Sequence, residues 1–202
     1  MYVPSHFAVD DRAQLVQFMA RHSFATLLSW SPEPMVSHLP LVVRSEPELL
    51  LLTHLARANP HARMLAAGGQ ALVIFQGPHA YVSPTLYESE QMVPTWNYTA
   101  VHAWVQARPV EDVDALLETT IGEFEASYLP RWRSLPDDYR NKMRQGIVAV
   151  ELRVERLEGK FKLSQNRSPA DQQRVMASFA ASDSAEQQAL AAMMQSLKKT
   201  SD

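Results

Sequence analysis

The sequence GPHAYVSPTLYESEQMVPTWNYTAVHAW, residues 77–104, combines three tyrosines, two tryptophans, two histidines and three prolines. Each proline lacks a backbone N–H and biases the preceding residue away from helix, so the stretch is expected to consist of extended pieces. Its second half, residues 95–105, is rich in β-branched and aromatic residues and predicts a strand. The rings and polar groups suit a surface for a flat, partly polar ligand, and they equally suit an aromatic hairpin in a β-barrel core. Residue types alone leave both interpretations open.

Length and composition limit the classes of protein to consider. The 202 residues fit one domain, or one domain with a small appendage, and 46% apolar with 20% charged residues is ordinary for a globular protein. A formal net charge of −3 predicts no general attraction to nucleic acid or anionic lipid, so a DNA contact would need a local basic patch. Without cysteine there are no disulfides or thiolate nucleophiles. The absence of a signal-peptide pattern and of a bilayer-length apolar run predicts a cytoplasmic protein without membrane contact.

Several motifs that carry chemistry are absent from the sequence. There is no GxGxxG, no GxxxxGK[ST], no GxSxG and no HExxH. A dinucleotide fold, a phosphate-binding P-loop, a nucleophile elbow and a metal site therefore have no support from sequence spacing. No helix-turn-helix with a basic recognition face is evident either, so reading of the DNA major groove is not predicted.

The first third of the chain predicts a helix followed by short strands. Asp10 is a candidate N-cap for a helix over residues 11–22, where apolar residues recur at helical spacing. Strands are expected at 24–30, at 35–44 with an interruption at Pro40, and at 48–54, with a turn at 31–34. Three short strands joined by tight turns predict an antiparallel meander. A further strand is expected at 71–76.

Residues 54–60, HLARANP, predict a strand end that leads through a loop into a short helix. Asn59 suits the N-cap and Pro60 the first helical position of a helix over 61–67, with Gly68 just past its end. The free N–H groups of a helix start and the Arg57 guanidinium together favour an anion such as phosphate. The alternative is an ordinary strand-to-helix turn with a solvated arginine.

The second half of the chain is expected to be mainly helical around one long strand. Apolar spacing predicts a helix over 113–128 that Pro130 ends, a second over 138–145 opened by a capping box at 134–137, and a half-exposed strand over 148–155. The chain then passes a basic patch of Lys160, Lys162 and Arg167, which either contacts an anion, such as a cofactor phosphate or nucleic acid, or is a solvated strand end. Helices over 169–179, capped by Ser168, and 184–197 predict a C-terminal helical extension at about residues 168–202.

Six segments, in order along nearly the whole chain, resemble the PaiB-type family of FMN-binding negative transcriptional regulators. They are MYVPSHF at 1–7, SHLPLV at 37–42, HLARANP at 54–60, GPHAYVSP at 77–84, VPTWNY at 93–98 with Val101-His102, and GKFKLSQNR at 159–167. The resemblance implies an α+β fold, an antiparallel split β-barrel of the FMN-binding type with peripheral helices, forming one domain over residues 1–202. It also implies a homodimer with FMN at the subunit interface. The chain departs from the family pattern at Thr85-Leu86 and at the acidic segment 88–90.

The resemblance also implies which residues hold the cofactor. The phosphate is expected at Ala56, Arg57 and Asn59, and the ring or ribityl chain at VPTWNY. Residues of GKFKLSQNR are expected to complete the site, and two histidines to line it. The full set is His38, His54, Ala56, Arg57, Asn59, Thr95, Trp96, Asn97, Tyr98, Lys162, Gln165 and Arg167.

Three functions follow as hypotheses. The first is a dimeric FMN-binding regulator, for which DNA contact has little support from charge. The second is a flavin-dependent oxidoreductase of small molecules. No residue stands out as its acid or base, so an enzyme is the less favoured interpretation. The third is a heme-binding split barrel, with His38, His54, His79 and His102 as candidate axial ligands.

Overall fold

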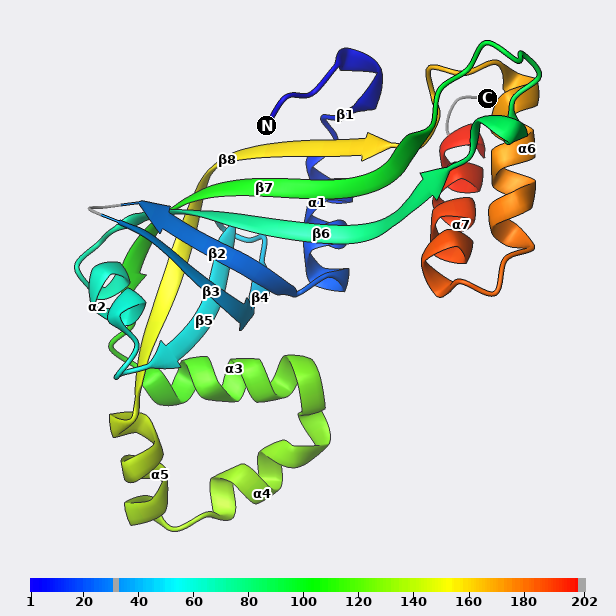
Figure 1. Ribbon diagram of the computed structural model, residues 1–202. Helices are drawn as coiled ribbons and strands as arrows, with labels where there is room; N and C mark the ends of the chain where they lie inside the picture. Colours follow the sequence, from blue (N-terminus) through cyan, green and yellow to red (C-terminus); the bar gives the residue numbers. More distant parts are fainter. Residues whose placement is uncertain (31–32, 200–202) are drawn as a thin grey trace. The chain divides into compact units, whose positions relative to one another are not determined.

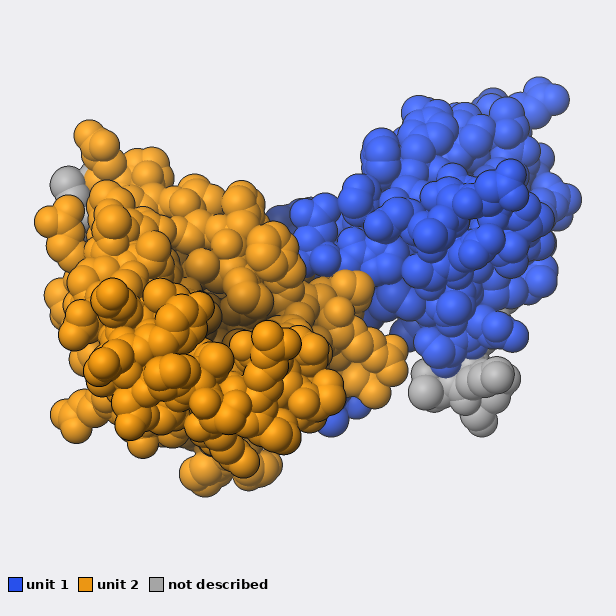
Figure 2. Space-filling model, turned by 90° about the horizontal axis from the view of Figure 1, so that it is seen from below, with its two compact units in different colours: residues 1–15, 76–101, 158–202 blue, residues 16–75, 102–157 orange. Residues whose placement is uncertain are grey.

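The computed structural model describes residues 1–30 and 33–199 of the chain (Figure 1). These residues form two compact units, shown in different colours in Figure 2. Unit 1 comprises residues 1–15, 76–101 and 158–202, and unit 2 comprises residues 16–75 and 102–157. Three long strands contribute residues to both units: β6 (Gln70–Val82), β7 (Thr95–Pro109) and β8 (Ile147–Lys162). Neither unit is a continuous segment of the chain.

An antiparallel sheet is the framework of the fold, as expected for an α+β protein of this type. Its strand order is β3-β2-β6-β7-β8-β5-β4, and the short strand β1 (Ala8–Val9) pairs with β8. The path has two different end strands and does not close on itself, which is consistent with a split barrel. Strands β6 and β7 are longer than the sequence predicted, because both continue well past the expected ends at Gln76 and Val105.

The expected meander is wrong in one respect. The predicted strand over 35–44 is two strands, β3 (Pro34–Pro40) and β4 (Val42–Arg44), which lie at opposite ends of the strand order. Strand β3 pairs with β2 (Phe24–Trp30), whereas β4 pairs with β5 (Leu50–Ala56). Pro40 cannot donate to a ladder, and its carbonyl accepts from Thr53 Oγ1 at 2.8 Å, while the Leu41 N–H donates to Ser23 at 2.9 Å. The chain therefore changes partners here. Part of the turn expected at 31–34 lies outside the described residues.

Local capping explains where three helices begin. Helix α1 (Arg12–Arg21) is capped by Asp11, not by Asp10 as predicted, because Asp11 Oδ1 accepts from the Ala13 N–H at 2.9 Å. Helix α2 (Pro60–Ala66) begins after Asn59, and α6 (Pro169–Ala180) begins after Ser168, both as predicted. Gly68 follows α2 with φ of +82°, a conformation that favours glycine.

The helices between β7 and β8 differ from the prediction around Pro130. Helix α3 (Val113–Glu125) ends earlier than expected and leads through a 3₁₀ turn (Ala126–Tyr128) into α4 (Leu129–Ser134). Pro130 lies in the first turn of α4, where its missing N–H costs nothing, so it starts a helix there. Helix α5 (Asp137–Gln145) follows without the predicted capping box, because the Ser134 hydroxyl donates to the Arg131 carbonyl.

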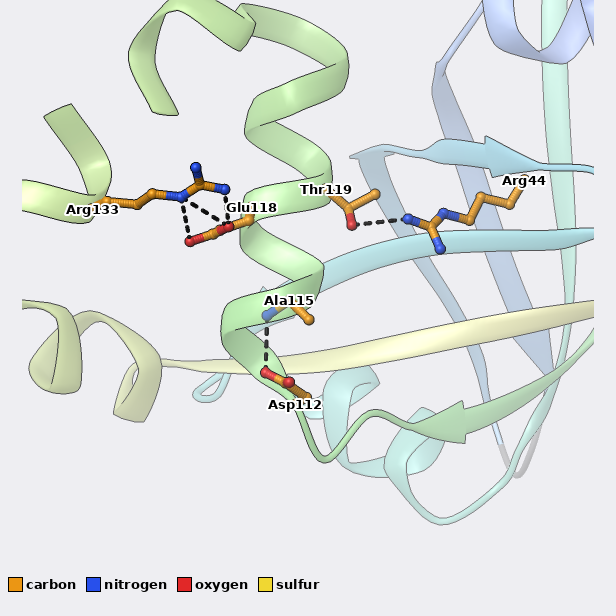
Figure 3. A network of polar contacts seen from close by, with 6 residues as sticks. All are labelled: Arg44, Asp112, Ala115, Glu118, Thr119 and Arg133. Carbon is orange, nitrogen blue, oxygen red and sulfur yellow. Dashed lines mark hydrogen bonds and ion pairs between the residues drawn. The ribbon is translucent and has the colours of Figure 1, made fainter. Parts of the chain in front are cut away.

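Polar contacts in unit 2 hold α3 in place (Figure 3). Asp112 Oδ1 accepts from the Ala115 N–H at 2.9 Å, and Arg44 of β4 donates to Thr119 Oγ1 at 3.1 Å. Arg133 of α4 makes a bidentate ion pair with Glu118, and its hydrogen bonds hold the pKa of that carboxyl below the usual value. The apolar side of α3 packs on the sheet through a small core of Val42, Leu52, Leu116 and Ala149.

Unit 1 contains the chain's N-terminal segment, with a 3₁₀ turn (Ser5–Phe7), and the C-terminal pair of helices α6 and α7 (Ala185–Lys199). A second 3₁₀ turn (Pro84–Leu86) lies between β6 and β7. The helices α6 and α7 contact each other and supply buried side chains, namely Val175, Phe179, Leu190, Ala191 and Met194. Helices α6 and α7 therefore belong to unit 1 and pack against each other there. No helix among the described residues is long and apolar enough to cross a membrane.

Candidate functional site

The residues predicted to bind the cofactor fall into two groups, one in each unit. His38, His54, Ala56, Arg57 and Asn59 belong to unit 2. The second group belongs to unit 1 and comprises Thr95, Trp96, Asn97, Tyr98, Lys162, Gln165 and Arg167. Within each unit the structure brings residues that are distant in sequence close together.

In unit 2 the Arg57 side chain binds backbone carbonyls. Its Nε donates to Gln145 O at 2.6 Å and its Nη2 donates to Ile147 O at 2.7 Å. The Arg57 N–H also donates to Gly146 O at 2.8 Å, so this one residue ties the end of β5 to the junction of α5 and β8. Ala56 pairs with Ile147 in the β5–β8 ladder. The guanidinium thus satisfies carbonyls at a helix C-terminus, where positive charge is favourable, and this contact was not visible in the sequence.

Asn59 acts through hydrogen bonds at the start of α2. Its Oδ1 accepts from the His61 N–H at 3.0 Å, as an N-cap does, and its Nδ2 lies 3.3 Å from Ser37 Oγ. His61 itself is almost completely buried, with 1% of its surface exposed. Its Nε2 lies 3.0 Å from Ser29 Oγ and its Nδ1 2.9 Å from Ser37 Oγ. This buried network of Ser29, Ser37, Asn59 and His61 links α2 to the β2–β3 pair.

Sequence reasoning missed His61, because neither serine is near it in the chain and an isolated histidine in a short helix carries no signal. Burial lowers the pKa of His61, and it also lowers the pKa of His54, which faces Ala149 across the β5–β8 ladder. Both rings are therefore biased towards the neutral form. His38 is more exposed, and its Nδ1 lies 3.1 Å from Thr26 Oγ1 on the neighbouring strand.

In unit 1 the Lys162 ammonium joins the two predicted segments. It donates to Thr95 Oγ1 and, at 2.6 Å, to the Trp96 carbonyl. Burial lowers the pKa of Lys162, and the nearby charges of Lys160 and Arg167 lower it further. Because Lys160 and Arg167 lie near Lys162, an anion placed among these three cations would relieve their mutual repulsion.

The other two cations of unit 1 contact aromatic rings. The Lys160 ammonium is buried, donates to the Tyr2 carbonyl at 3.0 Å and lies 5.2 Å from the centre of the Tyr98 ring. The Arg167 guanidinium lies 4.7 Å from the centre of the Tyr87 ring, and Nη1 is 3.4 Å from Met92 Sδ. Cation–π and sulfur contacts are weaker than ion pairs, so the guanidinium keeps hydrogen-bonding capacity for a ligand.

A tight turn at Ser164, directly after β8, connects Lys162 to Arg167. Ser164 has φ of +66°, and its hydroxyl exchanges hydrogen bonds with the buried Asn97 amide at 3.0 and 3.2 Å. The Gln165 Oε1 accepts from the Leu163 N–H at 2.7 Å. Asn97 and Gln165 therefore shape the backbone near Lys162, whereas Trp96, 52% exposed, lies on the surface beside Tyr81 and His79, with ring centres 6.1 and 6.3 Å away.

The candidate metal and heme ligands of the described chain come from both units. Among the described residues no group of three or more histidine, aspartate or glutamate side chains is placed to hold a metal ion. Of the four histidines considered for heme, His38, His54 and His102 belong to unit 2 and His79 to unit 1.

Comparisons with known proteins place the chain in a family. A family model described as "Putative FMN-binding domain" matches residues 1–156. The chain is 35% identical over 182 residues to "Protease synthase and sporulation protein PAI 2" of Bacillus subtilis (strain 168), with 87% of each chain covered.

Solved structures with the same fold have distant sequences. The flavocytochrome Anf3 from Azotobacter vinelandii is similar with a TM-score of 0.62 and 12% identity, covering 79% of this chain and 72% of that chain. The FAD and heme binding protein from Mycobacterium smegmatis has a TM-score of 0.59 and 14% identity, covering 77% and 73%. At these identities the likeness concerns the fold alone. The family model and the PAI 2 relative together lead to one assignment: the chain belongs to the PaiB-type family of FMN-binding domains.

Proposed function

We propose that this chain binds FMN and works as a homodimeric regulator of PaiB type. Family membership supports the cofactor, and the observation that carries the proposal is the cluster around Lys162 in unit 1. There, the cations Lys160, Lys162 and Arg167 lie next to aromatic rings, and Lys162 donates to the backbone carbonyl of Trp96, whose indole is exposed. A phosphate dianion suits the cations, and a flat heterocycle suits the indole.

The same contacts favour the cofactor over DNA as the partner of these cations. Lys160 is buried, and Lys162 is bonded to Thr95 and Trp96. A side chain that tracks a DNA backbone is normally exposed and mobile, so these lysines are poorly placed for it. We therefore assign Lys160, Lys162 and Arg167 to FMN. The regulatory role rests on family membership.

Arg57 provides a test of the predicted residues in unit 2. If its guanidinium contacts a phosphate of bound FMN, Arg57→Ala should weaken FMN binding by about tenfold to a hundredfold, the usual effect of losing a charged hydrogen bond. Riboflavin, which lacks the phosphate, should bind the variant as well as it binds the unaltered chain. Titration of both ligands by flavin fluorescence measures the two affinities.

The control is Arg63→Ala, which removes an exposed arginine of α2. An Arg57→Ala chain that loses affinity for FMN and riboflavin equally would limit Arg57 to its contacts with Gln145 and Ile147, and would contradict a phosphate role. Failure of the unaltered chain to bind FMN at micromolar concentration would overturn the proposed function.

An apolar face on β2 and β3 supports the proposed homodimer. Phe24, Val36 and Trp30 are 70%, 54% and 51% exposed. The ladder register sets Phe24 opposite Pro40 and Val36 opposite Leu28, on one face of the two strands, with the polar pair Thr26 and His38 between them. Strand β3 is also an end strand of the sheet, with one backbone edge unpaired in the described chain. An exposed apolar face at a sheet edge is typical of a contact between subunits, and a second copy of the chain is the proposed occupant.

Placing a charge on this face should separate the subunits. Val36→Lys is expected to convert the dimer to a monomer at micromolar concentration, because an unpaired ammonium would be buried in the contact. Sedimentation velocity distinguishes the two states. The control, Val93→Lys, introduces the same charge at an apolar residue of unit 1 that is 68% exposed. A Val36→Lys chain that stays dimeric would exclude this face.

A further inference from the structure

The C-terminal helices α6 and α7 lie beyond the residues matched by the family model, which end at residue 156. They nevertheless belong to unit 1, together with the segment 77–98 that carries the predicted ring-binding residues. Figure 1 shows the helix pair beside the ends of β6 and β7 within this unit. Their mutual packing buries Val175, Phe179 and Leu190 almost completely, so the pair is a well-formed element.

Two carboxylates from these helices accept hydrogen bonds from the backbone of segment 77–98. Asp171 Oδ1 of α6 accepts from the Glu88 N–H at 2.9 Å. Glu186 Oε2 of α7 accepts from the His79 N–H at 3.0 Å. Hydrogen bonds from an amide to a carboxylate are stronger than those between neutral groups, and that of the buried Asp171 is shielded from water, whereas Glu186 is about half exposed.

Of the two carboxylates, Asp171 is the stronger indication of a built contact, because only 4% of its surface is exposed. Its position in the first turn of α6 favours a negative charge, but a helix start does not require that the carboxylate be buried. A buried carboxylate is costly unless it is hydrogen bonded, and the Glu88 N–H supplies such a bond. The neighbouring ion pair of Arg174 with Glu88 is exposed and adds little.

Each contact leads to a residue already assigned to FMN. Glu88 follows Tyr87, whose ring lies beneath the Arg167 guanidinium at 4.7 Å. His79 has its ring centre 6.3 Å from that of Trp96. The hydrogen bond from Glu88 to Asp171 therefore holds the backbone next to the ring that contacts Arg167. The hydrogen bond from His79 to Glu186 holds the backbone of the residue whose ring lies beside Trp96.

We propose that Asp171 and Glu186 are positioning residues of the FMN site: the C-terminal helices hold the backbone at Glu88 and His79 and thereby place Arg167 and Trp96 for the cofactor. This inference rests on the proposed function. It predicts that the affinity for FMN depends on side chains that do not touch the cofactor.

Pairs of variants in the full-length chain test the inference. Asp171→Leu and Glu186→Met remove the acceptor oxygen with little change in size, whereas Asp171→Asn and Glu186→Gln retain one. The apolar variants are expected to raise the FMN dissociation constant by about 5-fold to 30-fold, and the amide variants by no more than about 3-fold. Hydrogen exchange should show faster exchange of the Glu88 N–H in Asp171→Leu and of the His79 N–H in Glu186→Met. Gln195→Met, at an exposed position of α7, is the control.

The outcomes separate this inference from the proposed function. A chain that binds FMN equally well with and without the two carboxylates overturns the inference and leaves the proposed function intact. Equal loss of affinity in the apolar and amide variants also overturns it, because the acceptor oxygen would then not be the cause. Absence of FMN binding to the unaltered chain overturns the proposed function itself. Faster exchange together with weaker binding, restored in the amide variants, supports the inference.

Discussion

Substituting Lys162 with methionine should lower the affinity for FMN by about tenfold to a hundredfold, the range expected when a charged hydrogen-bond donor to a phosphate is lost. The ammonium donates to Thr95 Oγ1 and to the Trp96 carbonyl, so its removal also loosens the segment that carries the exposed indole. Fluorescence titration with FMN measures the change.

The charge of Lys162 adds a dependence on pH to this prediction. Burial and the cations Lys160 and Arg167 lower the pKa of Lys162, so it loses its proton at a lower pH than an ordinary lysine. The affinity for FMN should therefore fall as the pH rises through that pKa, and this fall should be absent in Lys162→Met. Lys142→Met, at an exposed position of α5, controls for net charge. An affinity for FMN that is the same in Lys162→Met and the unaltered chain would remove this residue from the site.

Replacing His61 with leucine should lower the free energy of unfolding by about 2–5 kcal/mol, because the buried Ser29 hydroxyl loses its partner and the Ser37 hydroxyl keeps only Asn59. Ser29 is completely buried and Ser37 nearly so, and each contacts one ring nitrogen of His61. Urea denaturation measures the loss. Replacing both partners by apolar groups is far less costly than leaving one unpaired, so adding Ser29→Ala and Ser37→Ala to His61→Leu should recover part of it. A loss below about 0.5 kcal/mol in His61→Leu would show that the network contributes little.

The same histidine makes stability depend on pH. Burial lowers the pKa of folded His61 below its ordinary value of about 6.5, so the unfolded chain binds the proton more tightly. Stability is then complete above about pH 6.5 and is lost as the pH falls towards the folded pKa. Urea unfolding between about pH 7.5 and pH 5 should show a shallower decline in His61→Leu. His54, whose pKa burial also lowers, accounts for a remaining part of the slope.

Features set by near neighbours in the chain were predictable from sequence. Asn59 and Ser168 cap helices because an acceptor oxygen lies two or three residues before a free N–H, and the structure has both contacts. Gly68 with positive φ after α2 follows from the same local rule. Where two neighbouring residues could both serve as the N-cap, the local rule can choose the wrong one. Before α1 it predicted Asp10, whereas Asp11 caps the helix. The family resemblance, carried by segments such as HLARANP and VPTWNY, was also a property of sequence, and the family match confirms it.

Tertiary structure decided everything that depends on partners far apart in the chain. The residues that Arg57 binds lie 88 and 90 positions away, and the serines that enclose His61 lie 32 and 24 positions away. The separation of β3 from β4 at Pro40 depends on which strands they pair with, namely β2 for β3 and β5 for β4. Such contacts form only when the whole core selects one arrangement, since the free energy of each is small beside the chain entropy lost in closing a long loop. Residue type and spacing therefore determine caps, strands and family, whereas only the packed chain determines which donors keep hydrogen-bonding capacity for a cofactor.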